Sequence, residues 1–187
     1  MEEQDAIRLL KRGDIQGLEA LVQLYQVAAV RAADLITRDT ALAEDMVQTA
    51  FVTVYQRIDQ YDETKPFRPW FMRIVVNNAI KAVRRNREMS LDGLEMRNAM
   101  QFASNLPDPA QALESQELQQ TIWDALGELT PEQRAVIVMK YYLSFSEREI
   151  SESLNKPTST VKWRLHSART RLRGLLTALQ IQKTEVR

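Results

Sequence analysis

Cysteine is absent from the 187 residues, and histidine occurs once, at position 166. Without cysteine the chain can form no disulfide, no thiolate metal site and no cysteine nucleophile, and a single histidine cannot build a multi-histidine metal site. No apolar run approaches the roughly 20 residues that a membrane span needs. The charged N-terminus, MEEQDAIRLLKRGD, also lacks the apolar centre of an export signal. We therefore expect a cytoplasmic protein with no membrane insertion, no metal and no other cofactor.

Net charge is also absent, because 25 Lys and Arg balance 25 Asp and Glu, but the charges are segregated along the chain. Residues 65–87 contain seven basic and no acidic side chains, and residues 156–173 contain six basic and none acidic. Between them, residues 88–133 carry nine acidic side chains and one basic one, Arg97. Two positive segments separated by an acidic one are typical of a chain that contacts a polyanion at two places. A charged run alone is more often a solvated face.

Apolar residues recur at helical spacing in both halves of the chain, which predicts an all-α fold. From Ala43 to Ile58 they fall at three- and four-residue steps, so the FVTVY segment within this range is expected to be helical despite its strand propensity. Residues 89–118 lose this regularity and contain proline, glycine and several short polar residues. We predict two small helical domains, 1–87 and 119–187, joined by a flexible linker over 88–118.

Helix-capping patterns punctuate the second half of the chain. Thr130 with Gln133, and Ser146 with Glu149, have the spacing of a capping box. Asn155 precedes Lys156-Pro157 and tolerates the left-handed conformation that ends a helix. A new helix is expected from Thr158 or Ser159. Helix, tight turn and helix in this order predict a helix-turn-helix, the second helix of which can enter the major groove of DNA.

Val161, Leu165, Ala168 and Leu172 recur at steps of four, three and four, so they are expected to face inward. The remaining faces of this helix would then read bases and neutralise phosphates. The alternatives are a surface helix of some other bundle and, for Trp163, sideways packing. The candidate DNA contacts are Thr158, Ser159, Thr160, Lys162, Trp163, Arg164, His166, Ser167 and Arg171.

A second candidate surface is the segment PFRPWFMRIVVNNAIKAVRR, which combines aromatic and basic residues and has no acidic residue. Pro69 suits the first position of a helix that runs to about Arg85. Aromatic rings beside cations suit unpaired nucleic acid, and the loop over 60–68 can hold a base extruded from a duplex. The alternative is an aromatic core, which we favour for Phe71 and leave open for Trp70. The candidate nucleic-acid contacts are Tyr61, Lys65, Phe67, Arg68, Trp70, Arg73, Asn77, Asn78, Lys81, Arg84 and Arg85.

Four segments stand out, AEDMVQTAF, PFRPWFMRIVVNNAIKAVRR, ELTPEQRAVIVMKYY and LSFSEREISESLNKPTSTVKWRLHSARTRLR. In this order they resemble the signatures of the bacterial extracytoplasmic-function (ECF) sigma factors. The resemblance spans residues 13–86 as region two and 119–176 as region four. It implies a promoter-specificity subunit of RNA polymerase, with core RNA polymerase and promoter DNA as partners and no catalytic site of its own.

The resemblance also implies roles for individual residues. The polar helix face of Glu44, Asp45 and Gln48, with Asp39, would bind the clamp helices of the polymerase β′ subunit; the residues alone leave this face without a role. The loop over 60–68 would capture a flipped base of the minus-ten motif, and Trp70 would lie near the melting strand.

For the second half, the resemblance implies that the helix Ser159–Arg173 reads the minus-thirty-five motif and that region four contacts the β flap. The acidic linker would thread channels of the polymerase. Many such factors are inhibited by an anti-sigma factor, which here is expected to be a separate chain.

Three residues depart from the family pattern. Thr49 stands where an acidic residue is usual, Lys81 replaces a common Asp, and Trp163 occupies a position often held by Ser.

The alternative function is a free-standing helix-turn-helix regulator that binds duplex DNA without polymerase. An enzyme acting on nucleic acid would need convergent acids, a nucleophile or metal ligands, and the acidic residues lie away from both basic segments.

Overall fold

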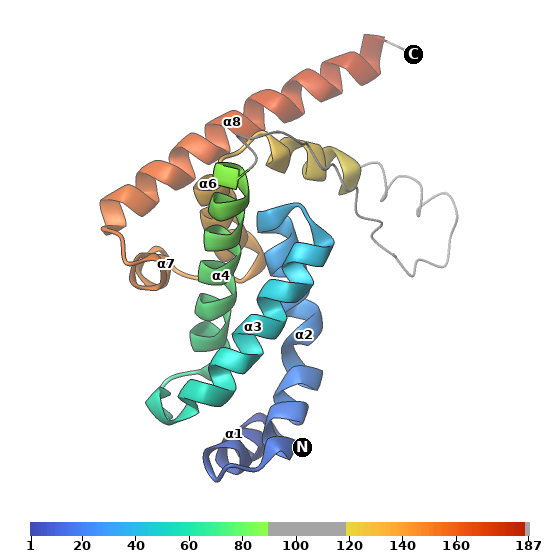
Figure 1. The fold of residues 1–187 in the computed structure, drawn as a ribbon. Coiled ribbons are helices and arrows are strands. Elements are labelled where there is room, and N and C mark those ends of the chain that lie inside the picture. Colours follow the sequence, from blue (N-terminus) through green and yellow to red (C-terminus); the bar gives the residue numbers. More distant parts are fainter. Residues whose placement is uncertain (90–118, 186–187) are drawn as a thin grey trace. The chain divides into compact units, whose positions relative to one another are not determined.

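Helices form all of the regular structure in the residues that the computed structural model describes, which are 1–89 and 119–185. This confirms the predicted all-α class. The chain divides into two compact units, Met1–Arg97 and Asn98–Arg187 (Figure 1). The predicted linker over 88–118 lies outside the described residues except for positions 88 and 89, which end a helix. The exact domain limits and the flexibility of the linker stay predictions.

The N-terminal unit is a helical bundle. Helix α2 contacts α1, α3 and α4, and α3 also contacts α4, while α1 lies against α2 and the short helix η1 at one end of the unit (Figure 1). The bounds are α1 Glu3–Lys11, α2 Ile15–Thr37, α3 Thr40–Arg57, η1 Ile58–Gln60 and α4 Phe67–Met89.

Side-chain caps set the starts of α2 and α3. The Asp14 carboxylate accepts a hydrogen bond from the Gln16 backbone N–H at 2.9 Å. Asp39 accepts from the Leu42 N–H at 3.0 Å. Helix α4 begins at Phe67, so Pro69 is its third residue rather than its first. Proline is accommodated there because N–H groups in the first turn have no partner within the helix.

Helix α1 is absent from our sequence-based predictions, although Ala6, Ile7 and Leu10 are buried at helical spacing. It lies so close to α2 that a Cβ atom on Gly17 would come within 2.3 Å of the Ala6 carbonyl oxygen. Glycine at position 17 therefore permits the contact between these two helices.

The core of the N-terminal unit confirms the predicted inward stripe of α3. Val47, Ala50 and Val54 are buried, and Phe51 is 6% exposed. Phe71 of α4 is fully buried, which also confirms the core interpretation of that ring.

The C-terminal unit contains a helix-turn-helix. Residues 119–127 are helical, followed by α6 Pro131–Ile137, the π-helical turn η3 Val138–Tyr142, α7 Glu147–Leu154 and α8 Thr158–Glu185. Both predicted capping boxes are formed, at Thr130 and at Ser146. Asn155 ends α7 with φ of 49°, in the left-handed region. Helix α7 packs against α8, as a helix-turn-helix requires.

One carboxyl group lies inside the N-terminal unit. Asp34 on α2 is fully buried, and its Oδ1 accepts a hydrogen bond from the Thr40 hydroxyl at 3.2 Å. Its Oδ2 is buried and has no hydrogen-bond partner among the described residues. Burial raises the pKa of Asp34 to about 6, against the opposing effect of Thr40, and the nearby carboxylates of Asp39 and Glu44 add to the rise.

We predict that Asp34→Asn stabilises this unit at neutral pH. The pKa of Asp34 rises from 3.8 in the unfolded chain to about 6 in the fold, so the folded state binds the proton more tightly. Its contribution to stability is complete below about pH 4 and is lost as the pH rises through about 6. An amide does not titrate, so the variant should gain about 1–2 kcal/mol in free energy of unfolding at pH 7.5.

Urea unfolding at pH 5, 6 and 7.5 measures this effect, with the exposed Asp45→Asn as the control variant. Equal pH slopes for wild type and Asp34→Asn would show that Asp34 remains ionised in the fold.

Candidate nucleic-acid interface

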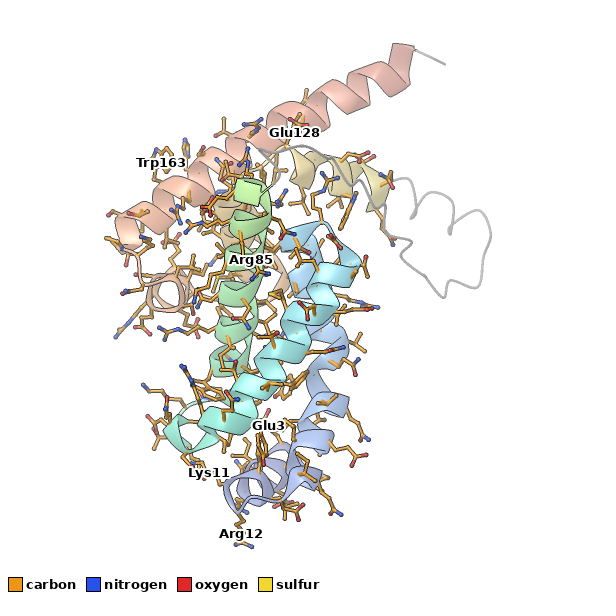
Figure 2. The ribbon with its side chains drawn as sticks, in the orientation of Figure 1. Glu3, Lys11, Arg12, Arg85, Glu128 and Trp163 are labelled. Atoms are coloured by element: carbon orange, nitrogen blue, oxygen red, sulfur yellow. The ribbon has the colours of Figure 1, made fainter. Side chains whose placement is uncertain are left out.

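Helix α4 presents a cationic face. Arg73, Lys81 and Arg85 are exposed, and three- and four-residue steps from Trp70 place Arg73 and Lys81 on one side of the helix together with Asn77. In the part of the chain that the structure describes, neither these three cations nor Arg68 forms an ion pair. Arg85 projects from α4 in Figure 2. The face is therefore basic and not neutralised by neighbouring carboxylates.

Two of the predicted nucleic-acid contacts belong instead to the core. Phe67 is fully buried and Tyr61 is 6% exposed. The Phe67 ring lies 5.3 Å from Tyr61 and 5.6 Å from Tyr25, centre to centre. These rings cannot stack on a base while the unit keeps this structure. Burying a large aromatic surface is the stronger physical demand at these positions, although the neighbouring charges suggest exposure.

Trp70 is intermediate between the two interpretations. Its ring centre lies 5.2 Å from Tyr61 and 5.6 Å from Phe67, yet the residue remains partly exposed. One part of the indole packs on the aromatic core, and another part is accessible beside the cationic face. Asn77 and Asn78 are partly buried, and the Asn78 amide nitrogen has no partner among the described residues.

Helix α8 confirms three of the four predicted inward positions, because Val161, Leu165 and Ala168 are buried, whereas Leu172 remains partly exposed. Lys162, Trp163 and His166 face solvent, and Trp163 is 66% exposed, so it does not pack sideways within the C-terminal unit (Figure 2). Thr158 and Ser159 at the start of α8 are exposed, whereas Thr160 and Arg164 are partly buried.

Ser167 and Arg171, both predicted to contact DNA, have partners within the C-terminal unit. The Ser167 hydroxyl accepts a hydrogen bond from the Gln133 side-chain amide at 3.0 Å, so it joins α8 to α6 and does not present a free group to a base. Arg171 lies 3.5 Å from Glu128, and both side chains are exposed. An exposed ion pair contributes little, so this arginine can exchange its partner for a phosphate.

Helix α3 carries a polar face on the side away from its buried stripe. Glu44, Asp45 and Gln48 are exposed and form no hydrogen bond or ion pair with other described residues. Val52 and Tyr55 continue this face at helical steps and are 53% and 48% exposed. Sequence reasoning missed both, although apolar residues outside the inward stripe are a usable signal.

Asp39, which was grouped with this face, already has a local role. Its carboxylate caps α3, and the residue is partly buried.

Among the described residues there is no cluster of acidic, histidine or cysteine side chains that could hold a metal. In the same part of the chain no helix is both long and apolar enough to cross a membrane.

Two family models match the chain. Sigma-70 region 2 matches residues 21–89, and Sigma-70 region 4 matches residues 119–172. Each match falls within one structural unit. Together with the helix-turn-helix and the two basic helices, they define a two-region protein of the sigma-70 class.

Similar known proteins identify the chain more narrowly within the sigma-70 class. The ECF RNA polymerase sigma factor SigW of Bacillus subtilis (strain 168) is 32% identical over 178 residues, which cover 91% of this chain and 94% of SigW. The solved structure of CnrH in complex with the cytosolic domain of CnrY matches with a TM-score of 0.66 at 25% identity, over 94% of this chain and 97% of that one.

A similar fold is found in the sigma factor RpoE from Bartonella quintana, solved in complex with the anti-sigma factor NepR. It matches with a TM-score of 0.69 at 23% identity, over 85% of this chain and 96% of that one.

The chain belongs to the ECF RNA polymerase sigma factors of the sigma-70 family. It is thus an alternative sigma factor, which directs transcription initiation by RNA polymerase.

We predict that Trp70→Ala impairs promoter strand opening more than it impairs engagement of duplex promoter DNA. A partly exposed ring can be removed without losing the fold, whereas one lost stacking contact should cost about 1–3 kcal/mol with the opened strand. Permanganate reactivity of unpaired thymines, compared with duplex binding by the holoenzyme, measures the difference.

Phe67→Ala is the matched comparison, because truncating this buried ring should destabilise the unit by about 3–5 kcal/mol. If Trp70→Ala unfolds the unit as Phe67→Ala does, Trp70 is a core residue and its proposed contact with DNA is wrong.

Proposed function

We propose that this sigma factor divides its work among three helix faces. The α3 face of Glu44, Asp45 and Gln48 binds core RNA polymerase, the α4 face binds the minus-ten element, and the α8 face binds the minus-thirty-five element. The observation that carries the proposal is that each structural unit exposes a basic helix face, on α4 in one unit and on α8 in the other. Two such faces suit two separate elements of one promoter.

The minus-ten role rests on the chemistry of α4 and the preceding loop. Arg68, Arg73 and Lys81 can neutralise phosphates because no neighbouring carboxylate competes for them among the described residues. Trp70 offers an accessible part of its ring for a base of the opened strand. Lys65 is exposed in the loop next to this face.

The minus-thirty-five role rests on the exposed side chains of α8. Lys162 and His166 can donate hydrogen bonds to base edges in the major groove, and Trp163 can make an apolar contact with a thymine methyl group. Lys162 lies 3.9 Å from Glu147, but both are on the surface, so this pair does not prevent a contact with DNA. The same unit would contact the β flap.

The polymerase role rests on the composition of the α3 face. Acidic and amide groups lie beside exposed Val52 and Tyr55, a mixture typical of a protein interface with an aromatic anchor. We assign this surface to the β′ clamp helices. We assign no catalytic role to the chain itself.

We also propose that this chain acts in the cytoplasm and is inhibited by a separate anti-sigma protein. The support is the relative from Bartonella quintana, whose solved structure contains the anti-sigma factor NepR. A protein that covers the α3 face would compete with polymerase.

The first test is co-elution of the purified chain with bacterial core RNA polymerase on a sizing column at moderate salt. We expect a stoichiometric complex that binds promoter DNA more tightly than the free chain does. Tight and specific binding of duplex DNA without polymerase, together with no co-elution, would instead support a free-standing helix-turn-helix regulator.

We predict that replacing Asp45 and Gln48 together with alanine weakens binding to core polymerase by at least about tenfold, as truncation at an interface centre does. Both side chains are exposed, so the fold should be retained, which circular dichroism can check. The matched control replaces Glu19 and Gln23 with alanine, an acid and an amide exposed on α2. Unchanged affinity of the first variant would contradict the clamp assignment.

A further inference from the structure

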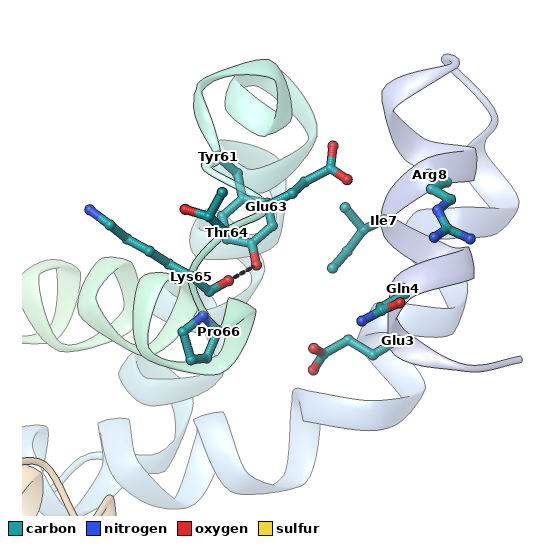
Figure 3. A pocket seen from close by; sticks show the side chains of 9 residues that line it. All are labelled: Glu3, Gln4, Ile7, Arg8, Tyr61, Glu63, Thr64, Lys65 and Pro66. Atoms are coloured by element: carbon teal, nitrogen blue, oxygen red, sulfur yellow. Dashed lines mark hydrogen bonds between the residues drawn. The ribbon is translucent and has the colours of Figure 1, made fainter.

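A pocket opens between helix α1 and the segment that connects η1 to α4. Its volume is about 430 Å³, which lies within the range of about 300–1,000 Å³ typical of small-molecule sites. Figure 3 shows the side chains of both walls around this space. The lining residues are Glu3, Gln4, Ile7 and Arg8 from α1, and Tyr61, Glu63, Thr64, Lys65 and Pro66 from the connecting segment.

The connecting segment, residues 61–66, has internal hydrogen bonds that define its shape. The Asp62 carboxylate accepts from the Thr64 backbone N–H at 3.0 Å and from the Thr64 hydroxyl at 2.6 Å. The Tyr61 hydroxyl donates to the Lys65 carbonyl oxygen across the turn (Figure 3). The segment is therefore folded on itself, and its position relative to α1 must be set by other contacts.

Lys11, the last residue of α1, makes those contacts. Its Nζ donates to the Tyr61 carbonyl oxygen at 3.2 Å and to the Glu63 carboxylate at 2.6 Å. The same ammonium group lies 5.9 Å from the centre of the Tyr61 ring. The Lys11 side chain is only 24% exposed, so these charge-assisted bonds are partly shielded from water. They join two segments that are about fifty residues apart in sequence.

The chemistry of the pocket suits a nucleobase better than a phosphate. Its charged lining is balanced, with the carboxylates of Glu3 and Glu63 and the cations of Arg8 and Lys65, so the pocket offers both acceptors and donors but no net positive charge to hold a phosphate. Carboxylate and amide oxygens accept hydrogen bonds from base edges, and Gln4 adds an amide. Cations that can hold the adjoining phosphates, Lys65 and Arg68, are exposed in or just after the connecting segment.

We infer that α1 forms the second wall of the site that captures an unpaired promoter nucleotide, and that Lys11 is a positioning residue for this site. This inference rests on the proposed minus-ten role of the connecting segment. Lys11 sets the separation between the two walls without touching DNA. Loss of its ammonium group removes these polar contacts between α1 and the segment, so the width of the pocket is less well defined and the captured base loses contacts.

The experiment uses holoenzyme assembled from core polymerase and the full chain, with Lys11→Met removing the charge and Lys11→Arg restoring it. The matched control is Arg12→Met, because Arg12 is the next residue, is exposed and has no side-chain hydrogen bond or ion pair with other described residues (Figure 2). The probe is a promoter fragment, selected by the wild-type holoenzyme from a random library, whose minus-ten segment is single-stranded. A series of fragments then carries one abasic site at each position of that segment.

Wild-type holoenzyme should lose about tenfold in affinity when the captured base is removed, the value of one well-held base. Lys11→Met should bind the intact fragment about tenfold more weakly, and removing the captured base should no longer weaken its binding. Lys11→Arg should regain most of the affinity and most of the abasic penalty, and Arg12→Met should match wild type. Fully duplex fragments and core polymerase should bind equally in all four proteins, which shows that the fold and the α3 face are intact.

If Lys11→Met retains the wild-type abasic penalty, the inference is wrong while the minus-ten role stands. If the wild type shows no abasic penalty at any position, the minus-ten role of the segment fails, and the inference with it. Should Lys11→Met lose its fold, Lys11→Gln, which keeps a polar side chain without the ammonium charge, takes its place, and the same loss of the abasic penalty is then required.

Discussion

The buried Phe67 ring determines how the N-terminal unit presents its basic surface. It is the first residue of α4, and it packs among Tyr25 of α2, Tyr61 at the start of the connecting segment, and Trp70 and Phe71 of α4 itself. One ring therefore fixes where the segment ends and how α4 is rotated. Each residue of a helix turns its side chain by about 100°. A shift of α4 by one residue would bring arginines toward the core, so the exposure of the cationic face depends on this packing.

The two basic faces differ in how free their side chains are. On α4, Arg68, Arg73 and Lys81 have no ion-pair partner among the described residues, so a phosphate can bind them without displacing a contact. On α8, Lys162 and Arg171 lie near Glu147 and Glu128, and DNA would exchange these weak surface pairs for stronger ones. A partner must displace these pairs before it can bind α8. We therefore expect α8 to discriminate more strongly than α4 against weakly charged or wrongly shaped partners.

The sequence predicts the local features well because they depend on neighbouring residues. Both capping boxes and the left-handed Asn155 are where their spacing places them. The burial of Tyr61 and Phe67 was not predictable, since an aromatic ring beside cations has the same local pattern whether it stacks on a base or fills a core. Helix α1 was missed because its apolar residues are few among charged ones. Its contact with Tyr61 and Glu63 joins positions 50 and 52 residues apart, and one sequence does not reveal such a pairing.

The connecting segment is attached at both ends, which bears on how it can bind. Phe67 anchors its exit in the aromatic core, Lys11 holds its entry against α1, and Asp62 and Thr64 bond to each other between them. A flexible loop would lose conformational freedom when it closed on a ligand, at roughly 0.5–1.5 kcal/mol for each ordered side chain. A segment already folded avoids most of this loss. The energy of capturing one base can therefore offset the few kcal/mol that extruding it from a duplex costs. The proposed role of this short segment thus depends on its shape more than on its composition.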